Sequence, residues 1–201
     1  MNSRVLLVAI AALFCFTAPN LYADNKYVGA GKCKSCHKSK KQGQQYGIWQ
    51  KSEHAKAFNS LATAEAKKLA QSVSVSGDPQ KAKECLVCHT SPKYDSQGKA
   101  RPASMFGKKF DVSEGVQCES CHGPGDKYWK KKVMKKIREE GGVRKSATAK
   151  KVGLRLPDEK VCQECHVAET KIGGVVYKNP SFKGFDFEKQ VKQIMHPVPK
   201  K

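Results

Sequence analysis

One short pattern, Cys-x-x-Cys-His, occurs four times in this 201-residue chain. Two thiols at this spacing can add across the two vinyl groups on one edge of a haem, and the imidazole that follows can bind the iron. The pattern therefore predicts four covalently bound c-type haems. The attachment residues would be Cys33, Cys36, Cys85, Cys88, Cys118, Cys121, Cys162 and Cys165, and the proximal iron ligands would be His37, His89, His122 and His166.

Two other uses of paired cysteines compete with haem attachment. Pairs of CxxC knuckles can hold structural zinc, and a single CxxC can act as a redox dithiol. Neither use requires a histidine directly after the second cysteine. The chain has six histidines, and four of them stand at that position. Haem attachment is therefore the favoured interpretation.

The remaining histidines, His54 and His196, are the candidates for distal iron ligands. A second imidazole gives a closed, low-spin iron that suits electron transfer, because neither oxidation state then changes its ligands. With two candidates for four haems, at least two haems lack a distal histidine from this chain. The alternatives for those haems are an open position, a lysine, a histidine of a partner subunit, or Met105, Met134 or Met195.

Helices are expected to position most of these residues. Apolar residues recur at helical spacing over residues 45–71, where Ser52 could cap part of the helix, and residues 127–140 and 185–194 show similar amphipathic patterns. Short helices from Pro79 and Pro157 would carry the second and fourth motifs. Unequal intervals between the motifs argue against a solenoid and favour one integrated domain.

Turns and loops are expected between these helices. Residues 91–113 are interrupted by proline and glycine and predict an irregular loop, while Gly173-Gly174 predicts a turn. The basic helix over 127–140 should present one apolar stripe. Glycines around the third motif should allow the backbone to approach a haem face closely. The stripe comprises Trp129, Val133 and Ile137, and the glycines are Gly115, Gly123 and Gly125.

The N-terminus has the features of a secretory signal peptide. Arg4 precedes an apolar run over residues 5–16, and residues 21–23 (Leu-Tyr-Ala) form an imperfect match to a small-residue cleavage site ending at Ala23. The apolar run is too short for a permanent membrane anchor. The bulky Phe14 argues against a lipoprotein signal at the cysteine that follows it. We therefore expect residues 1–23 to be removed during export to the periplasm or the cell exterior.

The amino-acid composition indicates a fold class and a kind of binding partner. The chain holds 38 Lys and Arg against 18 Asp and Glu, for a net charge of +20, and only 39% of its residues are hydrophobic. Residues 24–201 are therefore expected to form a single, compact, mainly α tetrahaem cytochrome c domain, with haems supplying much of the core and little β structure. The charge favours redox partners with acidic docking surfaces. No nucleic acid partner and no integral membrane segment after signal cleavage are expected, and self-association stays open.

Three segments carry a resemblance to the tetrahaem cytochrome c-554 family. They are residues 49–57, with Ser-Glu-His-Ala-Lys-Ala after Trp49, residues 115–125 around the third motif, and residues 185–196 at the C-terminus. The resemblance covers nearly all of residues 27–197. It implies a mostly helical protein with closely stacked haems that passes electrons between redox partners.

The resemblance also implies ligand roles. His54 would be a distal ligand, to the third haem, and His196 would be the distal ligand of the fourth haem. Family members can carry another distal histidine shortly after the third motif, but residues 126–136 contain none. The ligation of the first haem therefore departs from the family, and the resemblance would leave the second haem five-coordinate.

The sequence thus favours an exported electron-transfer protein in which electrons hop between stacked haems. Two alternatives belong to other classes. An enzyme could reduce a small nitrogen oxide at an open haem iron, although no acid–base pair stands out near a motif. A subunit of an extracellular cytochrome filament could receive its missing distal ligands from neighbouring subunits.

Overall fold

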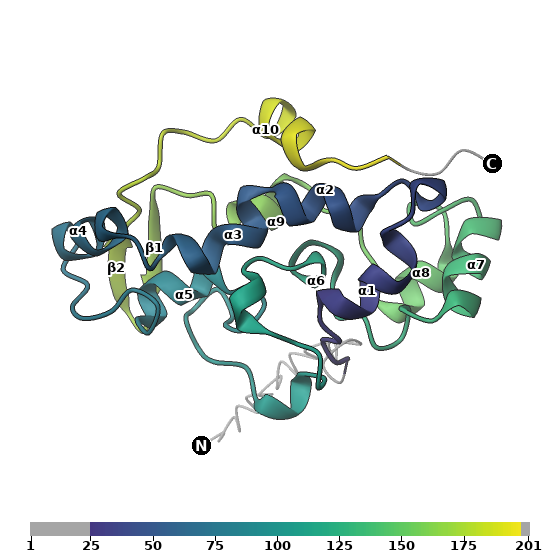
Figure 1. The fold of residues 1–201 in the computed structure, drawn as a ribbon, viewed down its shortest axis with the longest axis horizontal. Coiled ribbons are helices and arrows are strands. Elements are labelled where there is room, and N and C mark those ends of the chain that lie inside the picture. The colour runs from purple at the N-terminus through teal and green to yellow at the C-terminus, as the bar shows by residue number, and fades with distance from the viewer. Residues whose placement is uncertain (1–24, 198–201) are drawn as a thin grey trace, which may run out of the picture.

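The computed structural model describes residues 25–197 and is mainly helical (Figure 1). The helices are α1 Ala30–His37, α2 Gln45–Lys51, α3 Glu53–Ser60, α4 Ala64–Ser72, α5 Lys83–His89, α6 Cys118–His122, α7 Lys131–Glu139, α8 Ala147–Val152, α9 Glu159–Gln163 and α10 Phe187–Ile194. Short 3-10 turns are η1 Lys40–Gln42, η2 Ala103–Met105 and η3 Val112–Glu114, and the strands are β1 Glu169–Ile172 and β2 Val175–Lys178. The predicted signal peptide lies outside the described residues.

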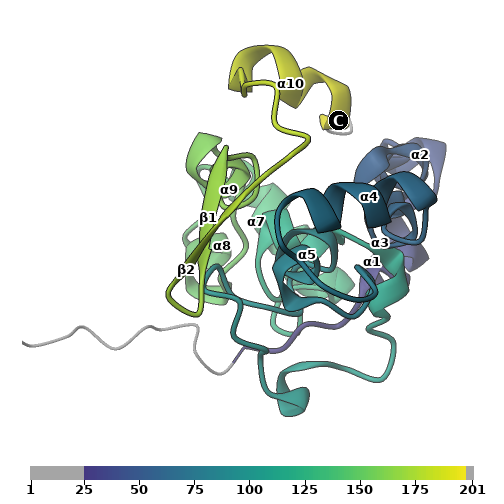
Figure 2. The ribbon, with the colours of Figure 1, turned by 90° about the vertical axis from the view of Figure 1, so that its left-hand side faces the viewer.

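The elements form an elongated body with two different ends (Figures 1 and 2). α1, α7 and α8 make one end, whereas α4, α5 and the β1–β2 hairpin make the other. α2 and α3 run between the ends, and α10 lies outside the body on extended connections. Within residues 25–197, none of the helices combines the length and the apolar character that crossing a membrane requires.

Within residues 25–197, the buried hydrophobic side chains form two small clusters. Their buried members are Tyr128, Ile137, Ala149 and Leu154 in one cluster and Ala30, Tyr46 and Trp49 in the other. The first cluster joins α7 to α8, and the second joins α1 to α2. Clusters of this size are consistent with haems that form much of the core, which stays a prediction.

The helical segment over residues 45–71 is three helices, not one continuous helix. Ser52 has an extended backbone (φ −76°, ψ 161°) that ends α2 and begins α3, and its hydroxyl donates to the Trp49 carbonyl at 2.6 Å. Thr63 caps α4 by accepting from the N–H of Ala66 at 3.1 Å. Serine and threonine compete for backbone hydrogen bonds in this way, so they interrupt a segment whose apolar spacing alone predicts one helix.

The basic helix is shorter than predicted. α7 begins at Lys131, because residues 125–130 form turns in which Tyr128 and Trp129 both donate their N–H groups to Gly125. Val133 and Ile137 pack into the α7–α8 cluster as the stripe predicts. Trp129 does not join them: it is 37% exposed.

The remaining elements agree with the sequence to within a few residues. α5 and α9 begin after Pro79 and Pro157, and Asp186 caps α10 by accepting from the N–H of Lys189 at 3.1 Å. Gly173-Gly174 turns the β1–β2 hairpin, and both glycines have positive φ (59° and 90°), as two-residue hairpin turns often require. The predicted mainly α fold with little β structure is confirmed.

Candidate haem-binding sites

Each Cys-x-x-Cys-His motif occupies about one helical turn. α1, α5 and α6 all end at their proximal histidines. The fourth motif begins in α9 and continues as a turn, in which the N–H groups of Cys165 and His166 both donate to the Cys162 carbonyl, at 3.1 and 3.0 Å. One helical turn brings both thiols and the imidazole of a motif close together. None of the eight motif cysteines is paired in a disulfide.

Two pairs of imidazole rings face one another across the molecule. The ring centroids of His54 and His166 are 5.9 Å apart, and those of His122 and His196 are 5.8 Å apart. With about 2 Å for each metal–imidazole bond, an iron between two rings would separate their centroids by about 6 Å. Both pairs therefore fit one iron each, bound by two imidazoles.

This pairing corrects the distal ligand assignment. The resemblance implies His54 for the third haem and His196 for the fourth, but His54 faces the histidine of the fourth motif and His196 faces that of the third. The segment after α10 is held over α2, because the Gln45 side chain donates to the Pro197 carbonyl at 3.1 Å. His196 is thereby brought to His122. The two assignments are exchanged.

His37 and His89 have no imidazole partner in this chain. All six histidines lie within the described residues, and the two ring pairs use the other four. The methionine candidates differ in their surroundings. Met105 lines a cavity, Met134 packs against the α7–α8 cluster, and Met195 is 65% exposed.

Three proximal imidazoles are oriented by acceptors at Nδ1. His89 Nδ1 lies 2.7 Å from the Ala57 carbonyl and His122 Nδ1 lies 2.9 Å from the Arg155 carbonyl. A carbonyl can only accept, so Nδ1 carries the proton and Nε2 keeps the lone pair that binds a metal. His37 Nδ1 lies 3.1 Å from Oε1 of Gln45. Because the Gln45 amide nitrogen donates elsewhere, its oxygen faces His37.

Burial favours the neutral form of these histidines. It lowers the pKa of His54, His89, His122, His166 and His196, because taking an imidazole out of water penalises its charged form. A neutral imidazole is the form that binds a metal ion. His166 is also stacked against Phe185, with ring centroids 5.0 Å apart and planes 20° apart.

Arg155 holds the third motif through four hydrogen bonds. Its carbonyl accepts from His122, and its N–H donates to the His122 carbonyl at 3.1 Å. Its guanidinium donates to the carbonyls of Cys121 and Ser120, both at 3.1 Å. These carbonyls lie at the C-terminal end of α6, where a cation also complements the helix dipole. The sequence gives no signal for this role.

Two residues of the third motif segment tie it to the start of the domain. Glu119 is 1% exposed, and its carboxylate accepts from the N–H groups of Val28, Gly29 and Gly125 at 2.6 to 2.8 Å. Gln117 is also 1% exposed and accepts from the N–H of Ala30 at 3.0 Å. The sequence shows Glu119 and Gln117 in this segment, but it does not show that their side chains bind the backbone of residues 28–30.

The glycines of the third motif segment approach protein atoms. A Cβ at Gly115 would lie 2.5 Å from the His54 carbonyl oxygen, and one at Gly123 would lie 2.6 Å from the Gly153 carbonyl oxygen. Gly115 and Val116 therefore dock on the start of α3, where the Val116 N–H donates to the His54 carbonyl at 2.9 Å. The sequence predicts close approach at these glycines, and the approach seen here is to backbone.

Thiols of different motifs identify which motifs are neighbours. The segment of the third motif binds the start of α1, where Glu119 and Gln117 accept from the N–H groups of Gly29 and Ala30, so the first motif lies beside the third, with the Cys33 and Cys118 side chains close together. The Cys88 and Cys165 side chains also lie close together, and α3 contacts both His89 and His166, so the second motif lies beside the fourth. Cys121 of the third motif lies near Cys162 and Glu164 of the fourth. The spatial order of the motifs is therefore first, third, fourth, second.

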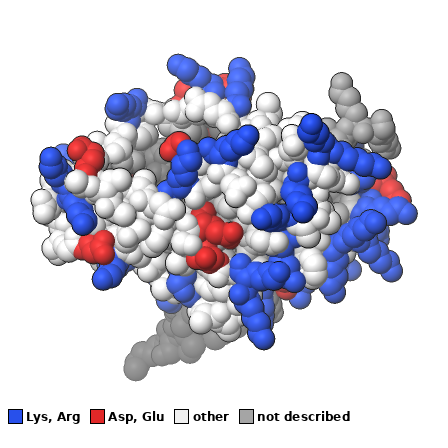
Figure 3. All heavy atoms as spheres, viewed as in Figure 1, with Lys and Arg blue, Asp and Glu red and all other residues white. Residues whose placement is uncertain are grey.

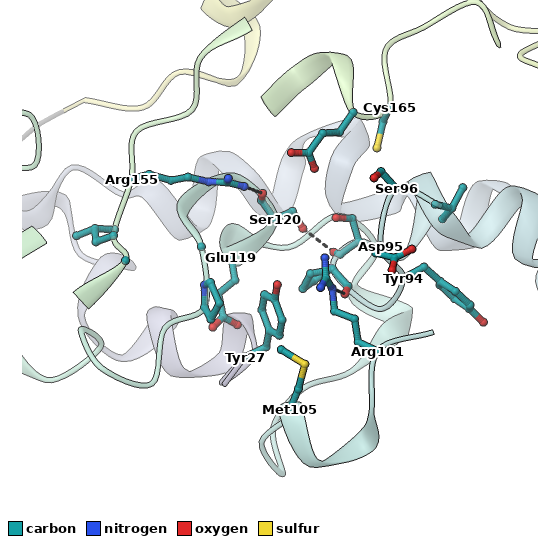
Figure 4. Close-up of a pocket in the computed structure, with 18 of the residues that line it drawn as sticks. Tyr27, Tyr94, Asp95, Ser96, Arg101, Met105, Glu119, Ser120, Arg155 and Cys165 are labelled. Carbon is teal, nitrogen blue, oxygen red and sulfur yellow. Dashed lines mark hydrogen bonds between the residues drawn. The ribbon is translucent and has the colours of Figure 1, made fainter. Parts of the chain in front are cut away.

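A cavity of about 750 Å³ opens beside these motifs (Figure 4). Tyr27 and Glu119 line one side, Arg101 and Met105 another, and Cys165 faces it from the fourth motif. Its volume lies in the range of cofactor sites. Its walls hold the Cys165 thiol, tyrosines and two arginines (Arg101 and Arg155), together with the carboxylates of Asp95, Glu119 and Glu164, and the two arginines would hold the anionic propionates of a haem there.

Known proteins share this sequence and this fold. The family described as "Cytochrome c554 and c-prime" matches residues 32–123. Cytochrome c-554 of Nitrosomonas europaea is 32% identical over 164 residues, which cover 78% of this chain and 65% of that protein. The structure of the reduced state of cytochrome c554 from Nitrosomonas europaea matches with a TM-score of 0.50 at 25% identity, covering 87% of this chain and 86% of the other.

The chain belongs to the cytochrome c-554 family. The resemblance predicted from the three sequence segments is thereby confirmed. Membership in the cytochrome c-554 family supports covalently bound c-type haem at the Cys-x-x-Cys-His motifs. The chain spans 65% of the length of the curated relative that it matches.

Proposed function

We propose that this protein is an exported electron carrier with four c-type haems, which passes electrons between two redox partner proteins. The four motifs and the cytochrome c-554 relationship support the cofactor. The haem irons, when bound, supply the one-electron chemistry. The protein holds and orients their imidazole ligands, and it sets the order in which the haems follow one another. The N-terminal signal pattern supports export, and residues 24–201 would form the mature domain.

The observation that carries the proposal is the arrangement of the imidazoles. The two central motifs in the spatial order, the third and the fourth, have the paired rings of His122 with His196 and His54 with His166. The terminal motifs, with His37 and His89, have none. Irons with two imidazoles keep their ligands in both oxidation states, so electrons can pass through the centre with little rearrangement. Electrons would enter and leave at the first and second haems.

The first test combines mass spectrometry with EPR on the oxidised, purified protein. We expect a mass that corresponds to the chain from Asp24 with four haems, and two low-spin signals typical of paired imidazoles. The His54→Ala variant should lose one of these signals and the His196→Ala variant the other. Four haems with no paired-imidazole signal, or fewer than four haems, would contradict the proposal.

An enzymatic role is the second candidate, and the lone imidazoles of His37 and His89 favour it. Either haem could offer an open iron to a small nitrogen oxide. Oxidised protein would then show a high-spin EPR signal that changes with nitric oxide or cyanide, and it would turn over nitrite, nitric oxide or hydroxylamine with a reductant. Ligand binding without turnover supports the carrier. Low-spin terminal haems that become high-spin on dilution would instead indicate histidines from neighbouring subunits, as in a filament.

A further inference from the structure

The positive charge of the chain is concentrated in two short segments. Residues 26–41 and 127–151 together contain 17 of the 38 Lys and Arg but only two of the 18 Asp and Glu. These segments therefore carry a net charge of +15 out of the total of +20. The rest of the chain is close to balanced. The basic character of this protein is local, although the lysines look dispersed along the sequence.

The fold brings these two segments together. The Lys32 ammonium lies 4.5 Å from the centre of the Trp129 ring, and the Asp126 N–H donates to the Lys26 carbonyl at 3.1 Å. The Arg138 guanidinium reaches Oε1 of Gln42 at 3.4 Å. Figure 3 shows Lys and Arg side chains gathered at the end of the molecule that Figure 1 assigns to α1, α7 and α8. We call this surface, formed by residues 26–41 and 127–151, the basic end.

The first haem motif lies within the basic end. Cys33 to His37 form the second half of α1, and Cys36 is exposed. Lys34, Lys38 and Lys41 beside the motif are exposed as well. In the spatial order of the motifs, the first is also terminal. A partner bound to the basic end would therefore meet a terminal haem, with the rest of the haems behind it.

The geometry points to the basic end as the docking face for a redox protein with an acidic surface, and to the first haem as the port through which electrons cross. The inference rests on the proposed electron-carrier function and adds the place and the chemistry of one partner. Complementary charge steers such partners into contact and raises the association rate, most strongly at low salt. The opposite end, near the second motif, lacks this concentration of charge and would serve another partner.

An acidic protein fits the basic end better than a lipid membrane does. Basic amphipathic helices bind membranes by inserting an apolar face between the lipids. Here α7 buries that face, since Val133 and Ile137 pack against α8 and Tyr128. The exposed side of α7 offers only charge.

The test uses the holoprotein and reduced flavodoxin, an acidic electron-transfer protein, as the probe. In the first variant, Lys130→Gln, Lys131→Gln and Lys132→Gln remove three exposed charges from the basic end. In the control variant, Lys67→Gln, Lys68→Gln and Lys178→Gln remove three exposed charges from α4 and β2 at the opposite end. Stopped-flow absorbance gives the second-order rate of haem reduction at several salt concentrations. Equal haem content and equal visible spectra show that both variants are intact.

We expect the first variant to react several-fold more slowly at low salt and to depend less steeply on salt, while the control stays near the wild-type rate. Equal slowing in both variants would show an effect of net charge alone and would overturn the inference. So would an unchanged rate in the first variant together with lost binding to phosphatidylglycerol vesicles, which would mark a membrane face. Wild-type protein that accepts no electrons would instead contradict the proposed function, so the two failures are distinguishable.

Discussion

At the scale of single residues, the haem ligands depend on partners that carry no motif of their own. His89 and His122 are oriented by backbone carbonyls of Ala57 and Arg155. A carbonyl is present at every position, so no residue type reveals which one will accept. Arg155 also has a charged side chain, and its two partners in the third motif, at Cys121 and Ser120, are again backbone carbonyls. These residues position the ligands and touch no iron themselves.

Removing the Arg155 side chain should lower the reduction potential of the third haem. A nearby positive charge stabilises the reduced iron, and its loss should shift the potential downward by on the order of tens of millivolts. Potentiometric titration followed by EPR of the His122–His196 iron would measure the shift in Arg155→Ala. Arg155→Lys keeps the charge and should stay closer to wild type. An unchanged potential in Arg155→Ala would show that the guanidinium has only a structural role.

Glu119→Gln should destabilise the domain. The carboxylate accepts three backbone N–H groups in a buried place, and an amide has only one oxygen to accept with. An N–H left without a partner costs about 1–3 kcal/mol. Denaturant unfolding of the holoprotein would measure the loss, with Glu65→Gln in the exposed first turn of α4 as the control. Equal stability of the two variants would contradict the role of Glu119.

At the scale of elements, α3 connects three of the four haem motifs. The His54 ring faces the fourth motif, the Ala57 carbonyl orients the proximal histidine of the second, and the His54 carbonyl binds Val116 beside the third. Trp49, at the end of α2, also donates its indole N–H to the Val116 carbonyl at 2.8 Å. Two of the sequence segments that carry the family resemblance therefore pack against each other.

Gly115→Ala should displace α3 and disturb the fourth haem. Its added Cβ would lie 2.5 Å from the His54 carbonyl oxygen, which cannot move without moving the helix. We expect the low-spin EPR signal of the His54–His166 iron to change or disappear. Gly77→Ala is the matched control, since Gly77 also has positive φ but has no atoms within 4 Å of the added Cβ. Backbone strain alone would affect stability in both variants and leave the EPR signal intact.

The junction of α7 and α8 should respond to acid. Glu140 accepts from the Ser146 and Thr148 hydroxyls and the Thr148 N–H, and these hydrogen bonds lower its pKa to about 2. A carboxyl whose pKa is lower in the folded protein contributes stability above its unfolded value, near 4.5, and loses it as the pH falls towards 2. The difference in melting temperature between wild type and Glu140→Gln should therefore shrink over this window. A constant difference from pH 6 to pH 2 would argue against it.

At the scale of the whole molecule, the small size of the protein clusters predicts that the fold depends on haem binding. The two clusters hold seven buried side chains within the described residues. A basic chain with so little apolar burial cannot offset the entropy of ordering its backbone. The haems, if bound as proposed, would supply the missing apolar surface between the helices.

The mature chain produced without haem attachment should therefore fail to fold. Variants in which all eight motif cysteines are replaced by alanine should show weak helical circular dichroism, no cooperative thermal transition and rapid proteolysis. The holoprotein, treated in parallel, should unfold cooperatively and resist protease. A cooperative transition in the haem-free variant would show that the polypeptide has a sufficient core of its own.

The sequence alone predicted the haem attachment sites, and it determined the mainly helical fold and the family. All three depend on local information: the motif lies within one helical turn, and amphipathic spacing extends over neighbouring turns. Helix boundaries were less predictable at Ser52 and Lys131, where side-chain and turn hydrogen bonds compete with the apolar pattern. The family resemblance even named both distal candidates, His54 and His196.

Only the tertiary structure decided which histidine faces which, the order of the motifs in space and the single basic end. His54 and His166 are separated by 112 positions, and residues 26–41 and 127–151 by more than 80. Whether such distant groups meet depends on how loops and backbone carbonyls direct the helices. Those contacts depend on the geometry of the folded backbone rather than on residue type, so they cannot be predicted from the pattern of residues along the sequence.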